Sequence, residues 1–157
     1  MVADLGGVRL IPERWVSENY REFAEEIAPV LLAALAGKRD VPPQKPFVEA
    51  WLAYALYYYD RLLFLEEVIE SADAINHGIP TADDVASAFL CLRKRGWLSV
   101  QGNKYGLTGE GRLAINTIVA QGSLERLNGW ISSHPPSRRV TSTDVFLALG
   151  KSKVKER

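Results

Sequence analysis

Apolar residues recur at helical spacing along most of this chain. The first such stretch begins after Ser17, a candidate N-cap, reaches Ala34 and is followed by Gly37, a candidate C-cap. The proline-rich segment 38–46 comes next and cannot form continuous helix, because proline lacks the backbone N–H that a helix interior uses. The pattern therefore predicts an amphipathic N-terminal helix and a stiff connector after it, and leaves residues 1–16 unassigned.

In residues 46–120 the predicted helices and strands follow one another with only short loops between them. The pattern predicts a helix from Pro46, a candidate strand at 62–64, a helix over 65–75, a helix from Thr81 to about Arg95, a hairpin of strands 97–100 and 104–107, and a helix from Thr108. Thr81 and Asp84 have the spacing of a capping box, and Gly96 is placed to end the helix. The loop 101–103 contains a glycine and suits a tight hairpin.

Two of these helices have a predicted buried face. The helix from Pro46 is expected to bury Phe47, Trp51, Tyr54, Ala55 and Tyr58. The helix from Thr108 is expected to use the apolar positions Leu113, Ile115, Ile118 and Val119.

Helical spacing resumes after Gly122-Ser123 and ends before a His-Pro-Pro break at 134–136. A last short helix is predicted from Ser142 or Thr143 to Leu149. We therefore divide the chain into an N-terminal extension with its helix, a central domain, C-terminal helices that pack or dimerise, and a basic tail: 1–45, 46–120, 121–149 and 150–157.

One run of residues points to a fold family. Leu92, Gly96 and the strand 97–100 are followed by Tyr105-Gly106-Leu107-Thr108-Gly109-Glu110-Gly111. This aromatic-x-Leu-Thr-x-x-Gly run, together with the order of elements, resembles the passage from third helix to wing in winged helix-turn-helix regulators, over about residues 46–120. The resemblance implies a mainly α (α+β) fold: a winged helix-turn-helix with a small two- or three-stranded wing sheet and flanking N- and C-terminal helices.

The same resemblance implies DNA as the ligand, because the recognition helix of a helix-turn-helix unit enters the major groove. The residues expected to contact DNA lie on the third helix, the wing and the next helix: Ser87, Arg93, Lys94, Arg95, Lys104 and Arg112. For residues 93–95, compensation of the helix dipole is an alternative explanation. We therefore expect a DNA-binding transcriptional regulator that forms a homodimer.

The distribution of charge is unfavourable for DNA binding. The chain has 19 Lys or Arg and 19 Asp or Glu, a formal net charge of zero. Residues 47–120 contain 6 basic and 9 acidic residues, whereas 134–157 contain 6 and 2. Asp83 and Asp84 also begin the third helix, where they would repel phosphates. The central domain therefore offers DNA little long-range attraction.

A protein partner is the alternative to DNA. The middle of the third helix, 85–92, is apolar nearly all round and needs cover on two sides. That cover is either the helix at 17–36 or a second copy of the chain, and both would take the surface away from DNA. The candidate interface residues are Leu90, Cys91, Trp51, Tyr54 and Tyr58. A third hypothesis is that Trp51, Tyr54 and Tyr57 to Tyr59 line a pocket for a flat ligand.

The sequence contains no catalytic or metal-binding motif that we recognise. His77 and His134 each lie at a helix-ending turn, and Cys91 is the only cysteine, which excludes an internal disulfide and a cysteine-based zinc site. No stretch reaches the roughly 18 to 20 apolar residues of a membrane span. We therefore expect a cytoplasmic protein without enzymatic activity, cofactor or metal.

Overall fold

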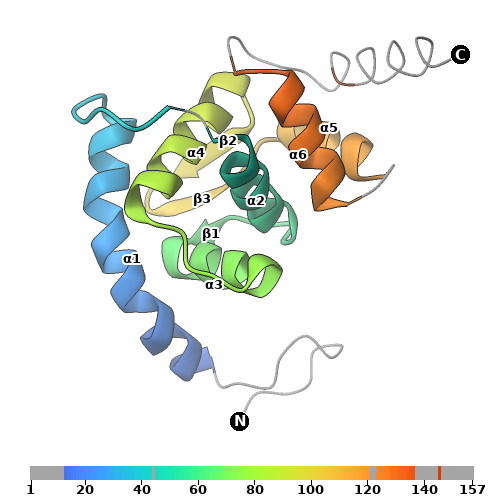
Figure 1. The fold of residues 1–157 in the computed structure, drawn as a ribbon. Coiled ribbons are helices and arrows are strands. Elements are labelled where there is room, and N and C mark those ends of the chain that lie inside the picture. Colours follow the sequence, from blue (N-terminus) through green and yellow to red (C-terminus); the bar gives the residue numbers. More distant parts are fainter. Residues whose placement is uncertain (1–12, 44, 121–122, 137–144, 146–157) are drawn as a thin grey trace, which may run out of the picture.

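The computed structural model describes residues 13–43, 45–120, 123–136 and 145. Across these residues the fold is mainly helical with a small three-stranded antiparallel sheet (Figure 1). The elements are α1 (Glu13–Leu35), α2 (Pro46–Tyr57), β1 (Leu63–Phe64), α3 (Leu65–Asn76), α4 (Ala82–Arg95), β2 (Leu98–Gln101), β3 (Lys104–Leu107), α5 (Gly109–Val119) and α6 (Leu124–Ser133). The predicted short helix ending at Leu149 and the basic tail 150–157 lie outside the described residues, Val145 excepted.

The three strands form one sheet in the order β1-β3-β2. Leu98 of β2 pairs with Leu107 of β3, and Leu63 of β1 pairs with Tyr105 of β3. Gly102 lies in the loop between β2 and β3 with a φ of +62°, which glycine adopts without strain. The predicted hairpin is therefore confirmed, and the candidate strand at 62–64 joins it.

Capping residues fix both ends of α4 and the start of α5. Thr81 Oγ1 accepts a hydrogen bond from the Asp84 N–H at 3.1 Å, and Gly96 ends α4 with a φ of +82°. Thr108 Oγ1 accepts from the Gly111 N–H at 3.0 Å at the start of α5. The predicted start of both helices and the predicted end of α4 are therefore confirmed.

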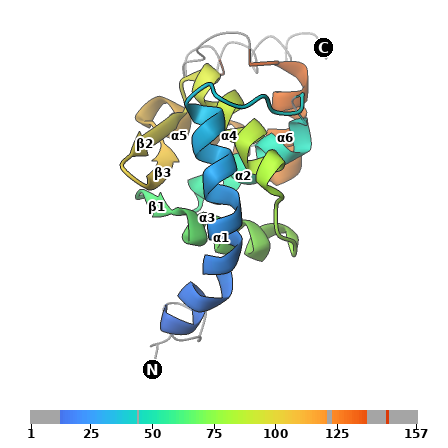
Figure 2. The ribbon, with the colours of Figure 1, turned by 90° about the vertical axis from the view of Figure 1, so that its left-hand side faces the viewer.

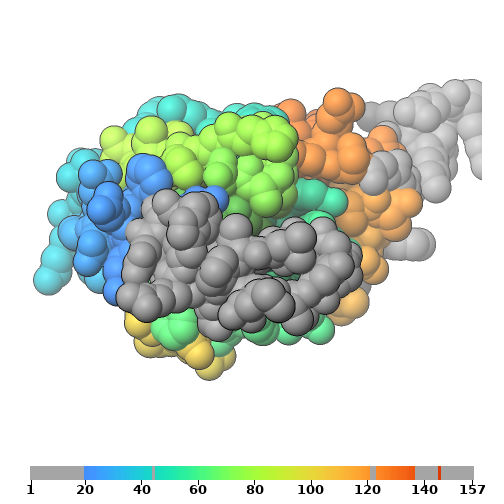
Figure 3. All heavy atoms as spheres, turned by 90° about the horizontal axis from the view of Figure 1, so that it is seen from below, coloured from blue at the N-terminus to red at the C-terminus, as the bar shows by residue number. Residues whose placement is uncertain are grey.

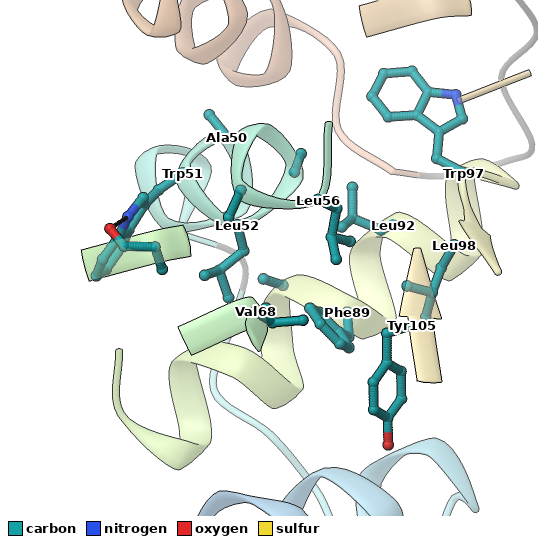
Figure 4. Close-up of a cluster of buried hydrophobic side chains, with 14 of the residues drawn as sticks. Ala50, Trp51, Leu52, Leu56, Val68, Phe89, Leu92, Trp97, Leu98 and Tyr105 are labelled. Atoms are coloured by element: carbon teal, nitrogen blue, oxygen red, sulfur yellow. Dashed lines mark hydrogen bonds between the residues drawn. The ribbon is translucent and has the colours of Figure 1, made fainter. Parts of the chain in front are cut away.

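The core forms around α2, which packs against α3, α4 and α6. The fully buried side chains in its middle are Ala50, Leu52, Ala53, Ala55 and Leu56. Figure 4 shows Leu52 and Leu56 in the same cluster as Phe89 of α4. The predicted buried face is wrong at Phe47 and Tyr58, which are 43% and 61% exposed because they lie at the two ends of the helix.

The N-terminal helix α1 lies across α3 and α4 (Figure 2). Its buried residues are Ala24, Ile27, Leu31 and Ala34. Tyr20 Oη also donates to Asp73 Oδ2 of α3 at 2.9 Å. The predicted N-cap Ser17 is wrong, because α1 begins at Glu13 and Ser17 lies inside it. Of the two covers predicted for residues 85–92, the structure supplies the chain's own helix.

Helices α5 and α6 lie on the side of the molecule opposite α1 (Figures 1 and 3). Leu127, Trp130 and Ile131 of α6 are buried and belong to the same cluster as residues of α1 and α2. One core therefore extends from α1 to α6. None of the described helices combines the length and apolar character required to cross a membrane.

Candidate functional site

The middle of the α4 surface that was expected to read DNA is covered. The buried residues of this helix are Val85, Ala86, Ser87, Ala88, Phe89, Cys91, Leu92 and Arg95. Ser87 is 6% exposed, and its hydroxyl donates to the Pro42 carbonyl at 3.3 Å. The expectation that Ser87 contacts DNA is therefore corrected, because the connector between α1 and α2 lies over it.

Two acidic residues at the start of α4 have partners on the same connector. Arg39 Nη2 lies 3.3 Å from Asp83 Oδ1, and Lys45 Nζ lies 3.2 Å from Asp84 Oδ1. Such exposed pairs each stabilise a fold by less than about 1 kcal/mol. They nevertheless neutralise the carboxylates that lead α4 and hold the connector against it.

The other end of α4 contacts the end of α1. Arg93 Nη1 donates to the carbonyl of Leu35, the last residue of α1, at 2.7 Å. Lys94 is exposed and so is Lys104 of β3, whose Nζ lies 4.9 Å from the centre of the Phe64 ring. Arg93, Lys94 and Lys104 are the predicted DNA contacts that the structure leaves exposed.

Arg95 is fully buried, which corrects the expectation that it contacts phosphate. Its Nε donates to Glu49 Oε2 of α2 at 2.5 Å, and its Nη2 donates to Glu49 Oε1 at 3.3 Å. The guanidinium carbon lies 5.4 Å from the Trp97 ring and 5.5 Å from the Trp130 ring. A buried charge needs such a partner, because an isolated ion in a protein interior is strongly destabilising. Arg95 therefore fastens α4 to α2.

Arg112 was expected to contact DNA, but its guanidinium is bonded within the protein. Its Nη1 and Nη2 donate to the carbonyls of Tyr57 and Tyr59 at 3.0 and 2.6 Å. Its Nε lies 3.4 Å from Asp60 Oδ1. With these partners the guanidinium ties α5 to the C-terminal end of α2.

The predicted interface residues separate into buried and exposed members. Trp51 is 6% exposed and donates from Nε1 to the Ala72 carbonyl at 2.8 Å. Cys91 is 8% exposed, and burial, assisted by the Glu49 carboxylate, raises the pKa of its thiol to about 11. The prediction that Trp51 and Cys91 contact a partner is therefore corrected, since both side chains belong to the interior. Leu90 and Tyr54 are half-buried, and Tyr58 is exposed.

An open groove of about 520 Å³ lies between the C-terminal end of α2 and α5. We call it the tyrosine groove; its lining residues are Tyr54, Tyr57, Tyr58, Asp60, Arg112, Leu113 and Asn116. The Tyr54 and Tyr57 rings are stacked with their centroids 5.9 Å apart, and Tyr54 meets Tyr58 edge to face at 6.4 Å. Tyr57 Oη donates to Asn116 Oδ1 at 2.7 Å. Of the residues predicted to line a pocket, Tyr54, Tyr57 and Tyr58 line this groove, whereas Trp51 is buried and Tyr59 is not among the lining residues.

Sequence reasoning missed three members of the tyrosine groove: Asp60, Leu113 and Asn116. Leu113 was expected on the apolar face of its helix, yet it is 55% exposed. The signal that could have found it is the spacing of Ala114 and Ile118, both fully buried and on the other side of α5.

Comparison of the chain with protein-family models, with curated proteins and with solved structures gives no match in any of the three. Among the residues that the structure describes, no cluster of three His, Cys, Asp or Glu is placed to hold a metal ion. The tyrosine groove offers aromatic faces, one carboxylate and one guanidinium, which suit recognition of another surface.

Proposed function

We propose that residues 46–120 form a winged-helix unit. The succession of a helix, a short strand, two helices and a hairpin from α2 to β3 supports this proposal. The sheet order, which places β3 between β1 and β2, agrees with a wing hairpin built onto the first strand. In such a unit α4 occupies the place of the helix that reads DNA.

We infer that this unit binds protein and does not read DNA through α4. The observation that carries the inference is the cover of α4 by α1 and the connector. A recognition helix needs a free outer face to enter the major groove. To free that face, α1 would have to leave and expose Ile27 and Leu31, which costs about 3–6 kcal/mol by the transfer free energy of two such side chains.

The outer face of α1 does not give DNA a substitute surface. Glu22, Glu25 and Glu26 are exposed on this helix. Three carboxylates on the element that covers α4 repel the phosphate backbone, whereas DNA affinity depends on Lys and Arg.

The tyrosine groove is the contact surface that we propose for the partner. Tyr58 is 61% exposed and Leu113 is 55% exposed, next to the half-buried ring of Tyr54. Tyrosine is among the residues that most often dominate the binding free energy of protein interfaces. Its large area and few rotatable bonds limit the entropy lost on binding.

Non-specific DNA binding is a second candidate, favoured by the exposure of Arg93, Lys94 and Lys104. Three phosphate contacts give a slope of about −2.7 for log K against log salt concentration. Contacts of this kind carry no sequence preference, because they reach the backbone only.

Affinity capture with the tagged full-length protein tests the proposed function. We expect a protein recovered in stoichiometric amount with the wild type and with Leu32→Asp, and lost with Leu113→Asp. The two variants are matched, since Leu32 of α1 is 54% exposed and Leu113 of the tyrosine groove is 55% exposed. A partner held equally by both variants contradicts the assignment of the groove.

A titration of mixed DNA duplexes at low salt, followed by fluorescence anisotropy, forms the second arm of this experiment. We expect either no binding or weak binding with a salt slope no steeper than about −3. Tight binding that discriminates between sequences contradicts the proposed function and restores the hypothesis of a DNA-reading regulator.

A further inference from the structure

The two most exposed large apolar side chains among the described residues lie in the same place. They are Tyr58 at 61% and Leu113 at 55%, and both line the tyrosine groove. Single exposed apolar residues are ordinary on protein surfaces, but neighbouring ones around a hollow indicate a contact site. The groove is therefore the strongest candidate for an interface in this part of the chain.

Contacts within the chain order the side chains that line the groove. Arg112 bonds the carbonyls of Tyr57 and Tyr59, and Tyr57 bonds Asn116 across to α5. The Tyr54 ring is in contact with the Tyr57 and Tyr58 rings. A surface ordered in this way loses little conformational entropy when it binds.

The charges of the groove are balanced. Asp60 is 94% exposed at the side chain, and the Arg112 guanidinium next to it is 27% exposed. A partner of one strong charge is attracted by one of these groups and repelled by the other. A partner that carries both charges in the reverse order is attracted by both.

We infer that the occupant of the tyrosine groove is a second copy of this chain, docked groove to groove about a two-fold axis. In an isologous contact the same surface of both copies is used, so a residue of one copy contacts a different residue of the other copy, and the reverse contact also forms. We therefore place Asp60 of one copy opposite Arg112 of the other, and Tyr58 over Leu113. The inference rests on the proposed function, because it names the partner of the same surface. α5 lies opposite α1, so the contact leaves the cover on α4 in place (Figures 1 and 3).

The predicted dimer is a reversible one. A stable interface buries about 800 Å² on each partner, and the seven lining residues supply only part of such an area. We therefore expect monomer and dimer to coexist in the micromolar range, where sedimentation velocity resolves both.

Sedimentation velocity of the full-length protein, from low micromolar to several hundred micromolar, tests this inference. We expect the wild type and Leu32→Asp to show the same rise in sedimentation coefficient with concentration. Leu113→Asp is expected to raise the dimer dissociation constant at least tenfold. Asp60→Arg is expected to raise it as well, because it places a cation opposite Arg112. Thermal melts check that the variants fold like the wild type.

Three results overturn the inference. A wild type that stays monomeric at every concentration excludes the second copy, and so does a dimer that Leu113→Asp leaves intact. Equal weakening by Leu32→Asp and Leu113→Asp also excludes the groove as the interface. If the wild type stays monomeric while affinity capture recovers a different protein through the groove, the second copy is excluded and the proposed function is kept.

Discussion

Replacement of Glu49 by glutamine is expected to lower the free energy of unfolding by about 3–5 kcal/mol, because it leaves a buried guanidinium without a counter-charge. The side chain of Arg95 is 0% exposed and that of Glu49 is 1% exposed, so water cannot compensate for the lost partner. The rings of Trp97 and Trp130 contact the guanidinium but carry no charge. Chemical denaturation of the variant and the wild type measures the difference.

The double variant Glu49→Leu, Arg95→Met is the control for this prediction. It removes both charges and keeps apolar volume in the core, so we expect it to be more stable than Glu49→Gln. A Glu49→Gln variant within 1 kcal/mol of the wild type, on the order of one hydrogen bond, would contradict the account of Arg95 as a core residue. It would also reopen the hypothesis that Arg95 turns outward to a phosphate.

Replacement of Gly111 by alanine is expected to lower the free energy of unfolding by about 3 kcal/mol, the upper end of what overpacking usually costs. A Cβ at this position would lie 2.7 Å from Trp97 Cβ and 2.9 Å from Trp97 Cα. Trp97 is fully buried beside Arg95 and Trp130, so it has little room to move. The same clash pushes α5 away from the sheet and disturbs the tyrosine groove, which Leu113 helps to form.

Gly109→Ala is the matched control, two residues earlier in the same helix. A Cβ at Gly109 meets nothing within 4 Å, so we expect no loss of stability and a gain of about 0.4–1 kcal/mol, because alanine restricts the unfolded chain more than glycine does. Thermal or chemical denaturation of the two variants side by side makes the comparison. Equal stability of the Gly109→Ala and Gly111→Ala proteins would contradict the close packing of α5 on Trp97.

Both ends of α4 and the start of α5 could be predicted because they depend on residues close in sequence. A threonine cap bonds an N–H three residues later, and a glycine ends a helix through its own backbone, as Thr81, Thr108 and Gly96 do. The tight hairpin after Gly96 follows from the same local chemistry. Patterns of this range are present in the sequence itself.

The burial of Arg95 could not be predicted. The last turn of α4 has three consecutive basic residues, 93–95, and only the side of the helix on which each one lies distinguishes them. The partner that decides the matter is Glu49, 46 positions away. One signal was available. Glu49 is the only charged residue of α2, and a lone carboxylate in an apolar helix indicates a buried cation nearby.

The tyrosine groove was predicted in part. Tyr54 and Tyr58 stood out as aromatic residues, but their neighbours come from α5, and the bond from Tyr57 to Asn116 spans 59 positions. No local sequence pattern predicts that α5 lies beside the C-terminal end of α2. For the same reason the sequence left open whether α1 or a second copy covers α4.

Hydrogen exchange of the full-length protein, resolved to peptides by mass spectrometry, tests most directly the central claim that α1 is a fixed cover on α4. Because Ile27 and Leu31 are buried in the shared core, we predict that the amides around them exchange as slowly as those of α4. Most of the stability of an amphipathic helix comes from its packing on the core, so a detached α1 would exchange faster than α4. Exchange of the α1 peptides within seconds, while α4 stays protected, would show that the cover is open and would contradict the account.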